Sequence, residues 1–181
     1  MPEHHAIKME FPGTLYICPR PRGHDWLLDE LRGFQRVGIQ NLVCLLTMDE
    51  KEELGLEREK QFCADLDIRF VHIPVDDRGL PDRYREFLGH SLSVLQWLHQ
   101  DEKVAVHCRA GIGRSTMFCA AIMYFHGIYP EEALEIIESA RGFPVPDTKQ
   151  QREWILSIHK FSESLSDLEL DLNGLPPGSR N

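Results

Sequence analysis

Short apolar runs alternate along the chain with longer segments of helical periodicity, and this alternation restricts the folds open to the sequence. The runs are rich in β-branched residues and have the length of buried strands. Strands that alternate with helices form a mostly parallel sheet covered by helices. We therefore expect an α/β fold with a mostly parallel central sheet flanked by helices. The predicted strands are 14–18, 41–46, 68–73 and 104–107.

Helix start and stop signals lie between these runs. Gly38 ends one helical pattern as a C-cap, and Pro130 opens another in its first turn. Asp82 and Asp147 are expected to cap the helices that follow them. The turn-forming segment 74–81 (PVDDRGLP) must be a loop. The predicted helices are 24–37, 49–66 with a break near Gly55, 82–100, 114–126, 130–141 and 147–165.

The length of 181 residues favours a single domain. We assign it to residues 14–165, between a flexible segment 1–13 and a poorly ordered, acidic and Pro/Gly-rich tail 166–181. No apolar stretch has the length of a membrane span, and the N-terminus lacks the apolar run of a signal peptide. The five cysteines are scattered, with no CxxC pair. This favours a reducing compartment, the cytoplasm.

The chain is acidic, with 20 Lys and Arg against 29 Asp and Glu and a net charge of −9. Such a chain binds nucleic acid and anionic membranes poorly, so we expect neither as a partner. A site for an anionic substrate must then build its positive potential locally. We expect the excess acid to lie away from that site, in 50–59 and 163–171.

The stretch His107 to Ser115 (HCRAGIGRS) carries the strongest signal in the sequence. It follows a predicted strand and opens a predicted helix, where glycine-containing turns and a helix N-terminus bind phosphate through backbone amides. Arg114 offers a planar fork that matches two phosphate oxygens. These positive groups should depress the pKa of Cys108, which gives a nucleophilic phosphatase site. The predicted phosphate-binding residues are Arg109, Ala110, Gly111, Ile112, Gly113 and Arg114.

The spacing His-Cys-x-x-Gly-x-x-Arg resembles the signature loop of the cysteine-dependent protein tyrosine phosphatase superfamily. The short chain and the lack of a Lys-Asn-Arg-Tyr segment resemble its compact dual-specificity branch, and within it the kinase-associated phosphatase group. The resemblance covers residues 14–165 and implies a protein tyrosine phosphatase-like fold. It also implies that Cys108 attacks phosphorus while Arg114 holds the phosphate oxygens.

The resemblance further implies a general acid on the loop 74–81, four residues before a proline. Asp77 before Pro81 has this spacing, and Asp76 is the alternative. A carboxylic acid there can protonate the leaving oxygen and later act as a base on water. Without the signature loop, both aspartates would be read as turn residues.

Three more roles come only from the resemblance. Ser115 donates to the sulfur as it leaves the phosphocysteine, although a serine at a helix start is also a cap. His107 positions the loop and tunes the thiolate. The segment ending in Thr148 and Gln151 has the family's Thr-x-x-Gln spacing, with Gln151 as the residue that positions water. Gln150 is the alternative, and an exposed polar helix turn is the other reading.

Nine histidines raise the question of a metal, but only His4 and His5 are adjacent. We expect no metal and no cofactor, since the cysteine and the arginine supply nucleophile and charge. Cys44 ends a buried strand, where it is either core or a partner that traps Cys108 in a disulfide. Cys63 and Cys119 are expected in the core.

The sequence therefore predicts a phosphatase that hydrolyses phosphotyrosine, and also phosphoserine and phosphothreonine, through a phosphocysteine intermediate. The expected partner is a phosphorylated protein or peptide. A phosphoinositide or an RNA 5′-phosphate is the alternative substrate. A phosphate-binding adaptor without turnover is the alternative outside enzymes, and Cys108, Arg114 and an upstream acid together weigh against it. The oligomeric state stays open.

Overall fold

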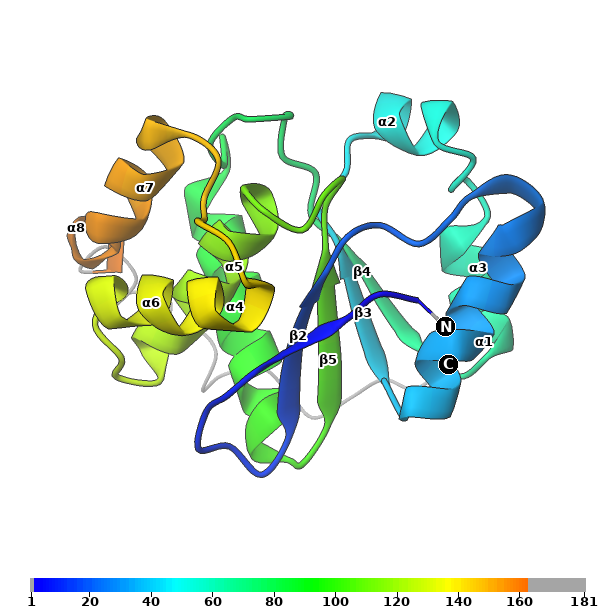
Figure 1. Ribbon diagram of the computed structural model, residues 1–181, viewed down its shortest axis with the longest axis horizontal. Coiled ribbons are helices and arrows are strands. Elements are labelled where there is room, and N and C mark those ends of the chain that lie inside the picture. Colours follow the sequence, from blue (N-terminus) through cyan, green and yellow to red (C-terminus); the bar gives the residue numbers. More distant parts are fainter. Residues whose placement is uncertain (1, 163–181) are drawn as a thin grey trace.

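The computed structural model describes residues 2–162 and contains a five-stranded sheet at its centre (Figure 1). The strands lie in the order β1-β2-β5-β3-β4. β1 pairs antiparallel with β2, and every other neighbouring pair is parallel. This confirms the mostly parallel α/β sheet. The strands are β1 (His5–Ile7), β2 (Thr14–Cys18), β3 (Asn41–Cys44), β4 (Arg69–His72) and β5 (Lys103–His107).

Helices cover both faces of the sheet, so its central strands are buried on both sides. In Figure 1, α4 to α8 lie on one side, and α1 and α3 lie on the other. No helix of the described part is both long and apolar enough to cross a membrane. The helices are η1 (His24–Trp26), α1 (Leu27–Val37), α2 (Met48–Glu53), α3 (Glu59–Asp65), α4 (Tyr84–His99), α5 (Arg114–Phe125), α6 (Pro130–Arg141), α7 (Lys149–Leu156) and α8 (Ile158–Ser162).

The core forms two clusters, one on each face of the sheet. Side chains of a strand alternate between the faces. Val43 and Val106 belong to the cluster with α4 and α5, whereas Cys44 and Ala105 belong to the cluster with α1 and α3. The continuous apolar runs that predicted strands buried on both faces are thereby explained.

The strand β1 corrects the prediction of a flexible segment over 1–13. It pairs with β2 at the edge of the sheet, with His5 opposite Ile17 and Ile7 opposite Leu15. Ile7 is buried in the core. Three residues carry little periodicity, so only the backbone of the neighbouring strand decides that this segment is a strand.

Two predicted helix caps are wrong. Asp82 lies in a turn with Arg83, and α4 begins at Tyr84 without a side-chain cap. Thr148 rather than Asp147 caps α7, because its hydroxyl accepts the Gln151 amide at 3.1 Å.

Glycines mark the helix ends as predicted. Gly38 and Gly142 follow α1 and α6 in left-handed conformation. The predicted break near Gly55 is also confirmed, since Gly55 has φ +68° and separates α2 from α3. The predicted helix 147–165 is interrupted at Ser157 between α7 and α8. Its end and the predicted tail 166–181 lie outside the described residues.

Candidate active site

The segment 107–115 connects the carboxyl end of β5 to the start of α5 (Figure 1). β5 lies between β2 and β3 in the middle of the sheet. Ligands of open α/β sheets bind at this edge, outside the carboxyl ends of the parallel strands. The loop therefore lies where its sequence predicted.

A pocket of about 160 Å³ opens beside this loop. Cys108, Arg109 and Arg114 line it from the signature segment, Asp77 from the loop before α4, and Gln151 from α7. The structure thus brings together side chains that are up to 74 positions apart (151 − 77). Its volume suits a small group such as a single phosphate.

Cys108 differs from the other four cysteines in its ionisation. It is buried, which raises a thiol pKa, but the Ser115 hydroxyl, the amides of Ser115 and Ile112 and the Arg114 guanidinium stabilise the thiolate. The pKa of Cys108 is therefore lowered from its ordinary value. The Ser115 Oγ is buried and has no oxygen or nitrogen partner among the described residues. Its hydroxyl is therefore available to donate to the Cys108 sulfur.

All five cysteines lie in the described part, and burial raises the pKa of the other four thiols. It raises the pKa of Cys18 to about 12 and also raises the pKa values of Cys44, Cys63 and Cys119. A thiolate, not a thiol, is the nucleophile. Cys108 is therefore the cysteine of this chain whose environment favours the thiolate form.

Glycine is required at position 111 by the close approach of two loops. Gly111 has φ +67°, and a Cβ there would lie 2.5 Å from the carbonyl carbon and oxygen of Cys18 and 2.8 Å from the nitrogen of Pro19. Both the backbone conformation and the space exclude a larger residue. The backbone amide of Arg20 also donates to the Arg109 carbonyl at 3.2 Å.

Gly113 meets the segment that leads into α7. A Cβ at this position would lie 2.3 Å from Asp147 Oδ1 and 2.5 Å from Gln151 Oε1. Gln151 donates to the Gly79 carbonyl at 3.2 Å, and Asp147 Oδ2 lies 3.9 Å from an Arg78 nitrogen. The α7 segment therefore contacts both the signature loop and the acid loop.

Arg114 is held by a carboxylate that the sequence did not indicate. Its side chain is 2% exposed and makes two hydrogen bonds to Glu50, of 2.6 and 2.8 Å, and one to the Val75 carbonyl, of 2.9 Å. Burial opposes ionisation of Glu50, but the bonds from Arg114 and from the Thr47 amide lower its pKa overall. A capping box, Thr47-x-x-Glu50 three residues after the end of β3, is the signal that could have found it.

The excess acid does not lie away from the site, contrary to the expectation for 50–59. Glu50 pairs with Arg114, and Glu53 pairs with Arg109 at 2.5 Å. Glu50 also lies 3.8 Å from Arg109. Each of the two signature-loop arginines is thus paired with a carboxylate of α2, whose position next to the loop is set by the fold. Segment 163–171 lies outside the described residues.

The two candidate acids occupy different places. Asp77 Oδ1 accepts a hydrogen bond from Arg114 at 2.9 Å and lines the Cys108 pocket. Asp76, which is exposed like Asp77, lines a separate cavity with Val75 and Leu80, and its carbonyl accepts the Gly79 amide in a turn. The geometry therefore distinguishes them, although the sequence left both open.

The structure also distinguishes Gln151 from Gln150 by burial and by position relative to the pocket. Gln151 is fully buried, lines the pocket, and its Oε1 has no hydrogen-bond partner among the described residues. Gln150 is exposed. Of the remaining predicted phosphate-binding residues, Ala110 and Ile112 line the pocket, whereas Gly111 is buried against Cys18.

Arg141 is a further residue that sequence reasoning missed. It is the last residue of α6, its side chain is 3% exposed, and it donates to the Ala110 carbonyl of the signature loop at 3.2 Å. It also donates to Glu3 at 3.2 Å. A basic last-turn residue before Gly142 looks like ordinary helix chemistry, so no sequence signal set it apart.

His107 and Cys44 lie together behind the loop. His107 Nε2 is 3.0 Å from Glu59 Oε1, and the ligating atoms of Cys44, Glu59 and His107 lie within 4.8 Å of one another. Lys51 Nζ is 3.5 Å from Glu59 Oε2, so a cation already pairs with this carboxylate. Cys44 packs in the core cluster with α1 and α3, whereas Cys108 packs in the other cluster.

Known proteins resemble this chain over most of its length. The model of the dual specificity phosphatase catalytic domain matches residues 42–169. Cyclin-dependent kinase inhibitor 3 of Mus musculus is 24% identical over 143 residues, which cover 76% of this chain and 63% of that protein. The chain thus spans less than two thirds of the length of this relative.

Solved structures share the fold. A crystal structure of kinase-associated phosphatase, with its catalytic cysteine replaced by serine, has a TM-score of 0.76 at 19% identity and covers 91% of this chain and 96% of its own. The crystal structure of PTPMT1 in complex with PI(5)P has a TM-score of 0.70 at 20% identity and covers 90% and 98%. With the family match over residues 42–169 and the signature loop at the end of β5, the chain belongs to the dual specificity phosphatase family.

Proposed function

We propose that the protein is a cysteine-dependent phosphatase that hydrolyses phosphotyrosine in proteins, with phosphoserine and phosphothreonine as further substrates. One observation carries the proposal. Cys108 alone among the five cysteines has a lowered pKa, and it lies in a phosphate-sized pocket with Arg114 and Asp77. A phosphate-binding adaptor needs the pocket but has no use for an activated thiolate next to an acid.

In the first step, the Cys108 thiolate attacks phosphorus, so that an S–P bond forms and the ester P–O bond breaks. Asp77 gives its proton to the leaving oxygen. Arg114 and the loop amides bind the equatorial oxygens, where charge is spread in the transition state. The bidentate bond to Glu50 fixes the guanidinium in one orientation before substrate arrives.

In the second step, water attacks phosphorus and the S–P bond breaks. Asp77, now a carboxylate, takes the proton from that water. Gln151 positions this water. The burial of its unpaired Oε1 beside the pocket supports this role. Ser115 donates to the departing thiolate, which is consistent with its stabilising effect on the Cys108 sulfur. Nucleophile and charge come from the chain, so the reaction as proposed needs no cofactor.

The Asp77–Arg114 contact describes the protein before substrate binds. One guanidinium nitrogen of Arg114 donates a hydrogen bond to Asp77 Oδ1 at 2.9 Å. A bound phosphate needs the same nitrogen for a two-point contact. We infer that phosphate displaces Asp77 from Arg114 and leaves its carboxyl next to the leaving oxygen.

The charges around the pocket favour substrates with one phosphate. Arg109, Arg114 and Arg78 each lie within 4.0 Å of a carboxylate of Glu53, Glu50 or Asp147. A second phosphate would meet no unpaired arginine among these three. This favours phosphoproteins over phosphoinositides, although PTPMT1 binds PI(5)P, and over RNA 5′-phosphates. A reducing compartment such as the cytoplasm would keep Cys108 as a free thiol.

Purified protein in EDTA should hydrolyse p-nitrophenyl phosphate, and Cys108→Ser should remove turnover while keeping phosphate binding. Retained turnover in this variant would disprove the mechanism. Cys119→Ser, a buried cysteine with a raised pKa, is the matched control and should stay active. A panel of phosphotyrosine, phosphoserine and phosphothreonine peptides, phosphoinositides and RNA 5′-triphosphate then tests the substrate class.

The assignment of the acid has its own test. Asp77→Asn should lower kcat by about 10²–10⁴-fold for substrates with a poor leaving group and remove the limb of the pH–rate profile that requires an acid. Asp76→Asn, one position away and outside the pocket, should leave the profile unchanged. The opposite pattern would transfer the role to Asp76.

A further inference from the structure

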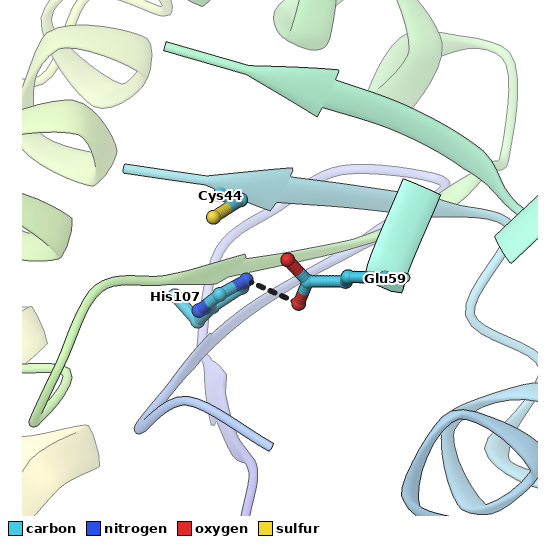
Figure 2. Close-up of side chains that lie close together, drawn as sticks. All are labelled: Cys44, Glu59 and His107. Atoms are coloured by element: carbon cyan, nitrogen blue, oxygen red, sulfur yellow. Dashed lines mark ion pairs between the residues drawn. The ribbon is translucent and has the colours of Figure 1, made fainter. Parts of the chain in front are cut away.

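Three side chains that can bind a metal ion point toward one another in the core behind the signature loop (Figure 2). They are Cys44 at the end of β3, Glu59 at the start of α3 and His107 at the end of β5. Their ligating atoms all lie within 4.8 Å of one another, and His107 Nε2 is 3.0 Å from Glu59 Oε1. Residues this far apart in the chain form no spacing motif, so the sequence gave no reason to expect a metal here.

The polar atoms of this cluster lack the hydrogen bonds that burial usually requires. The side chains of Glu59 and His107 are both 0% exposed, and Cys44 is fully buried. Among the described residues, neither carboxylate oxygen of Glu59 has a hydrogen-bond partner, and His107 Nε2 has none either. Buried polar groups are nearly always satisfied, and exceptions point to strain, to a catalytic role or to a bound water or ion. An ion shared by Nε2 and Oε1 would satisfy both atoms.

The other contacts of these side chains are those that metal ligands usually have. His107 Nδ1 lies 3.2 Å from the Cys108 carbonyl oxygen, which only accepts, so in the neutral ring the lone pair is on Nε2. Lys51 Nζ lies 3.5 Å from Glu59 Oε2 and 4.7 Å from the centre of the Phe70 ring. Lys51 therefore pairs with one carboxylate oxygen and leaves Oε1 facing His107. Histidine and carboxylate ligands of metals typically have such partners on their outer side.

Sulfur, nitrogen and oxygen donors in one set favour zinc, which binds thiolate, imidazole and carboxylate alike. Bonds of about 2.0–2.3 Å to a tetrahedral ion place its donors about 3.3–3.6 Å apart. The observed separations, 3.0 Å between Nε2 and Oε1 and at most 4.8 Å in the cluster, lie on either side of this spacing. Small side-chain rotations would therefore suffice. One thiolate and one carboxylate also balance the two charges of the ion, which lowers the cost of burying it.

We propose that Cys44, Glu59 and His107 form a structural zinc site that joins β3, α3 and β5 behind the signature loop. A site with three protein ligands completes its tetrahedron with a small donor such as water. Because the three ligands are buried, the ion enters as the chain folds, and its binding stabilises the folded state. The ion takes no part in the proposed hydrolysis of phosphate esters, so the zinc site and the phosphatase can each fail without the other.

The first test measures the zinc content of the full chain after refolding from urea in a slight excess of zinc and removal of free metal by desalting. It uses Cys108→Ser protein, in which the nucleophile cannot bind the ion. We expect one zinc per chain, quantified by atomic emission. Zinc that is retained by the unaltered protein but not by Cys108→Ser would be bound to the nucleophile, and this result would overturn the proposal.

Variants of the Cys108→Ser protein locate the ion. Cys44→Ser and Glu59→Gln keep the size of the side chains and should each weaken zinc binding by more than about 100-fold, since the loss of an outer partner alone costs about 10–100-fold. Competition with a chromophoric chelator measures this affinity. Cys119→Ser replaces a buried thiol of the other core cluster and should bind zinc as before. Undiminished binding by both ligand variants would place the ion elsewhere, for example at His4 and His5, and would refute the proposal.

Two measurements on the Cys108→Ser protein do not depend on a ligand variant folding. X-ray absorption at the zinc edge should show sulfur at about 2.3 Å together with nitrogen and oxygen at about 2.0–2.2 Å. A shell without sulfur would disprove the site. Zinc at a hundred times its dissociation constant should also raise the midpoint of thermal unfolding by about 5–10 °C relative to EDTA. Equal midpoints in zinc and in EDTA would contradict a structural role for the ion.

Discussion

Glu50 shows how one side chain can serve a local element and the site together. Its carboxylate accepts the Thr47 amide at 3.0 Å, which completes the capping box of α2, and it also grips Arg114 with two bonds. Arg114 is almost fully buried, so an unpaired guanidinium there would be costly. The start of α2 thus fixes the orientation of the phosphate-binding arginine.

We predict that Glu50→Gln lowers the free energy of unfolding by about 1.5–3 kcal/mol at neutral pH, since charge-assisted hydrogen bonds are lost. The pKa of Glu50 is depressed in the folded protein. Its contribution is therefore complete above the unfolded pKa and is lost as pH falls through the lower folded value. Urea unfolding from pH 7 to pH 3 should show the two proteins converging at low pH.

Glu53→Gln is the matched control for this experiment. Glu53 pairs with Arg109 on the surface, where the side chains are 59% and 41% exposed. An exposed pair contributes about 0–1 kcal/mol. A loss at Glu53 as large as that at Glu50 would contradict the assignment of Glu50 as the buried anchor.

At the scale of elements, contacts with three neighbouring segments determine the shape of the signature loop. The end of β2 packs on Gly111, the α7 segment packs on Gly113, and Arg141 at the end of α6 binds the Ala110 carbonyl. Each contact comes from a different part of the chain. The loop is thereby fixed before phosphate arrives, which is the condition for electrostatic preorganisation.

Gly111→Ala should be strongly destabilising and should reduce turnover of p-nitrophenyl phosphate. The left-handed backbone and the clash with the Cys18 carbonyl together cost about 2–5 kcal/mol. Gly127→Ala is the control, because Gly127 has φ +94° but open space around its Cβ position. It should lose only about 1–2 kcal/mol and keep its activity, as measured by thermal unfolding and initial rates. Equal losses in the two variants would show that backbone strain alone, without the close approach, sets the requirement at Gly111.

At the scale of the whole molecule, an acidic protein surrounds a site for an anion. The net charge is −9, and the arginines near the pocket are paired with carboxylates. Positive potential for the phosphate comes from Arg114, the loop amides and the start of α5 rather than from the surface. The protein as a whole therefore presents a net negative charge to the residues that flank the phosphate.

Phosphotyrosine peptides with basic flanks should accordingly be better substrates than peptides with acidic flanks. We expect a difference in kcat/KM of about tenfold at low ionic strength, because the long-range field attracts the basic peptide. The ratio should fall as salt is raised toward about 0.5 M, where charges are screened over a few ångströms. Steady-state kinetics on a matched peptide pair would test this, and a ratio independent of salt would contradict it.

Much of the fold could be predicted from local pattern. The four strands predicted at 14–18, 41–46, 68–73 and 104–107 are confirmed with ends that differ by at most two residues, and so is the helix opening at Pro130, because buried strands and capped helices have strong periodic signals. β1, the start of α4 at Tyr84 and the cap of α7 at Thr148 were missed. β1 forms only because β2 lies beside it. A helix cap depends on which of two adjacent residues reaches the helix amides.

The sequence by itself determined the α/β class and the His-Cys-x-x-Gly-x-x-Arg loop, since period and spacing are local properties of the chain. Tertiary structure decided which side chains meet this loop. Glu50, Glu59 and Arg141 reach it from α2, α3 and α6, at distances of 2.6 Å from Arg114, 3.0 Å from His107 and 3.2 Å from Ala110. A carboxylate that neutralises an arginine and one that lies on the surface are alike in sequence, and only packing makes them different.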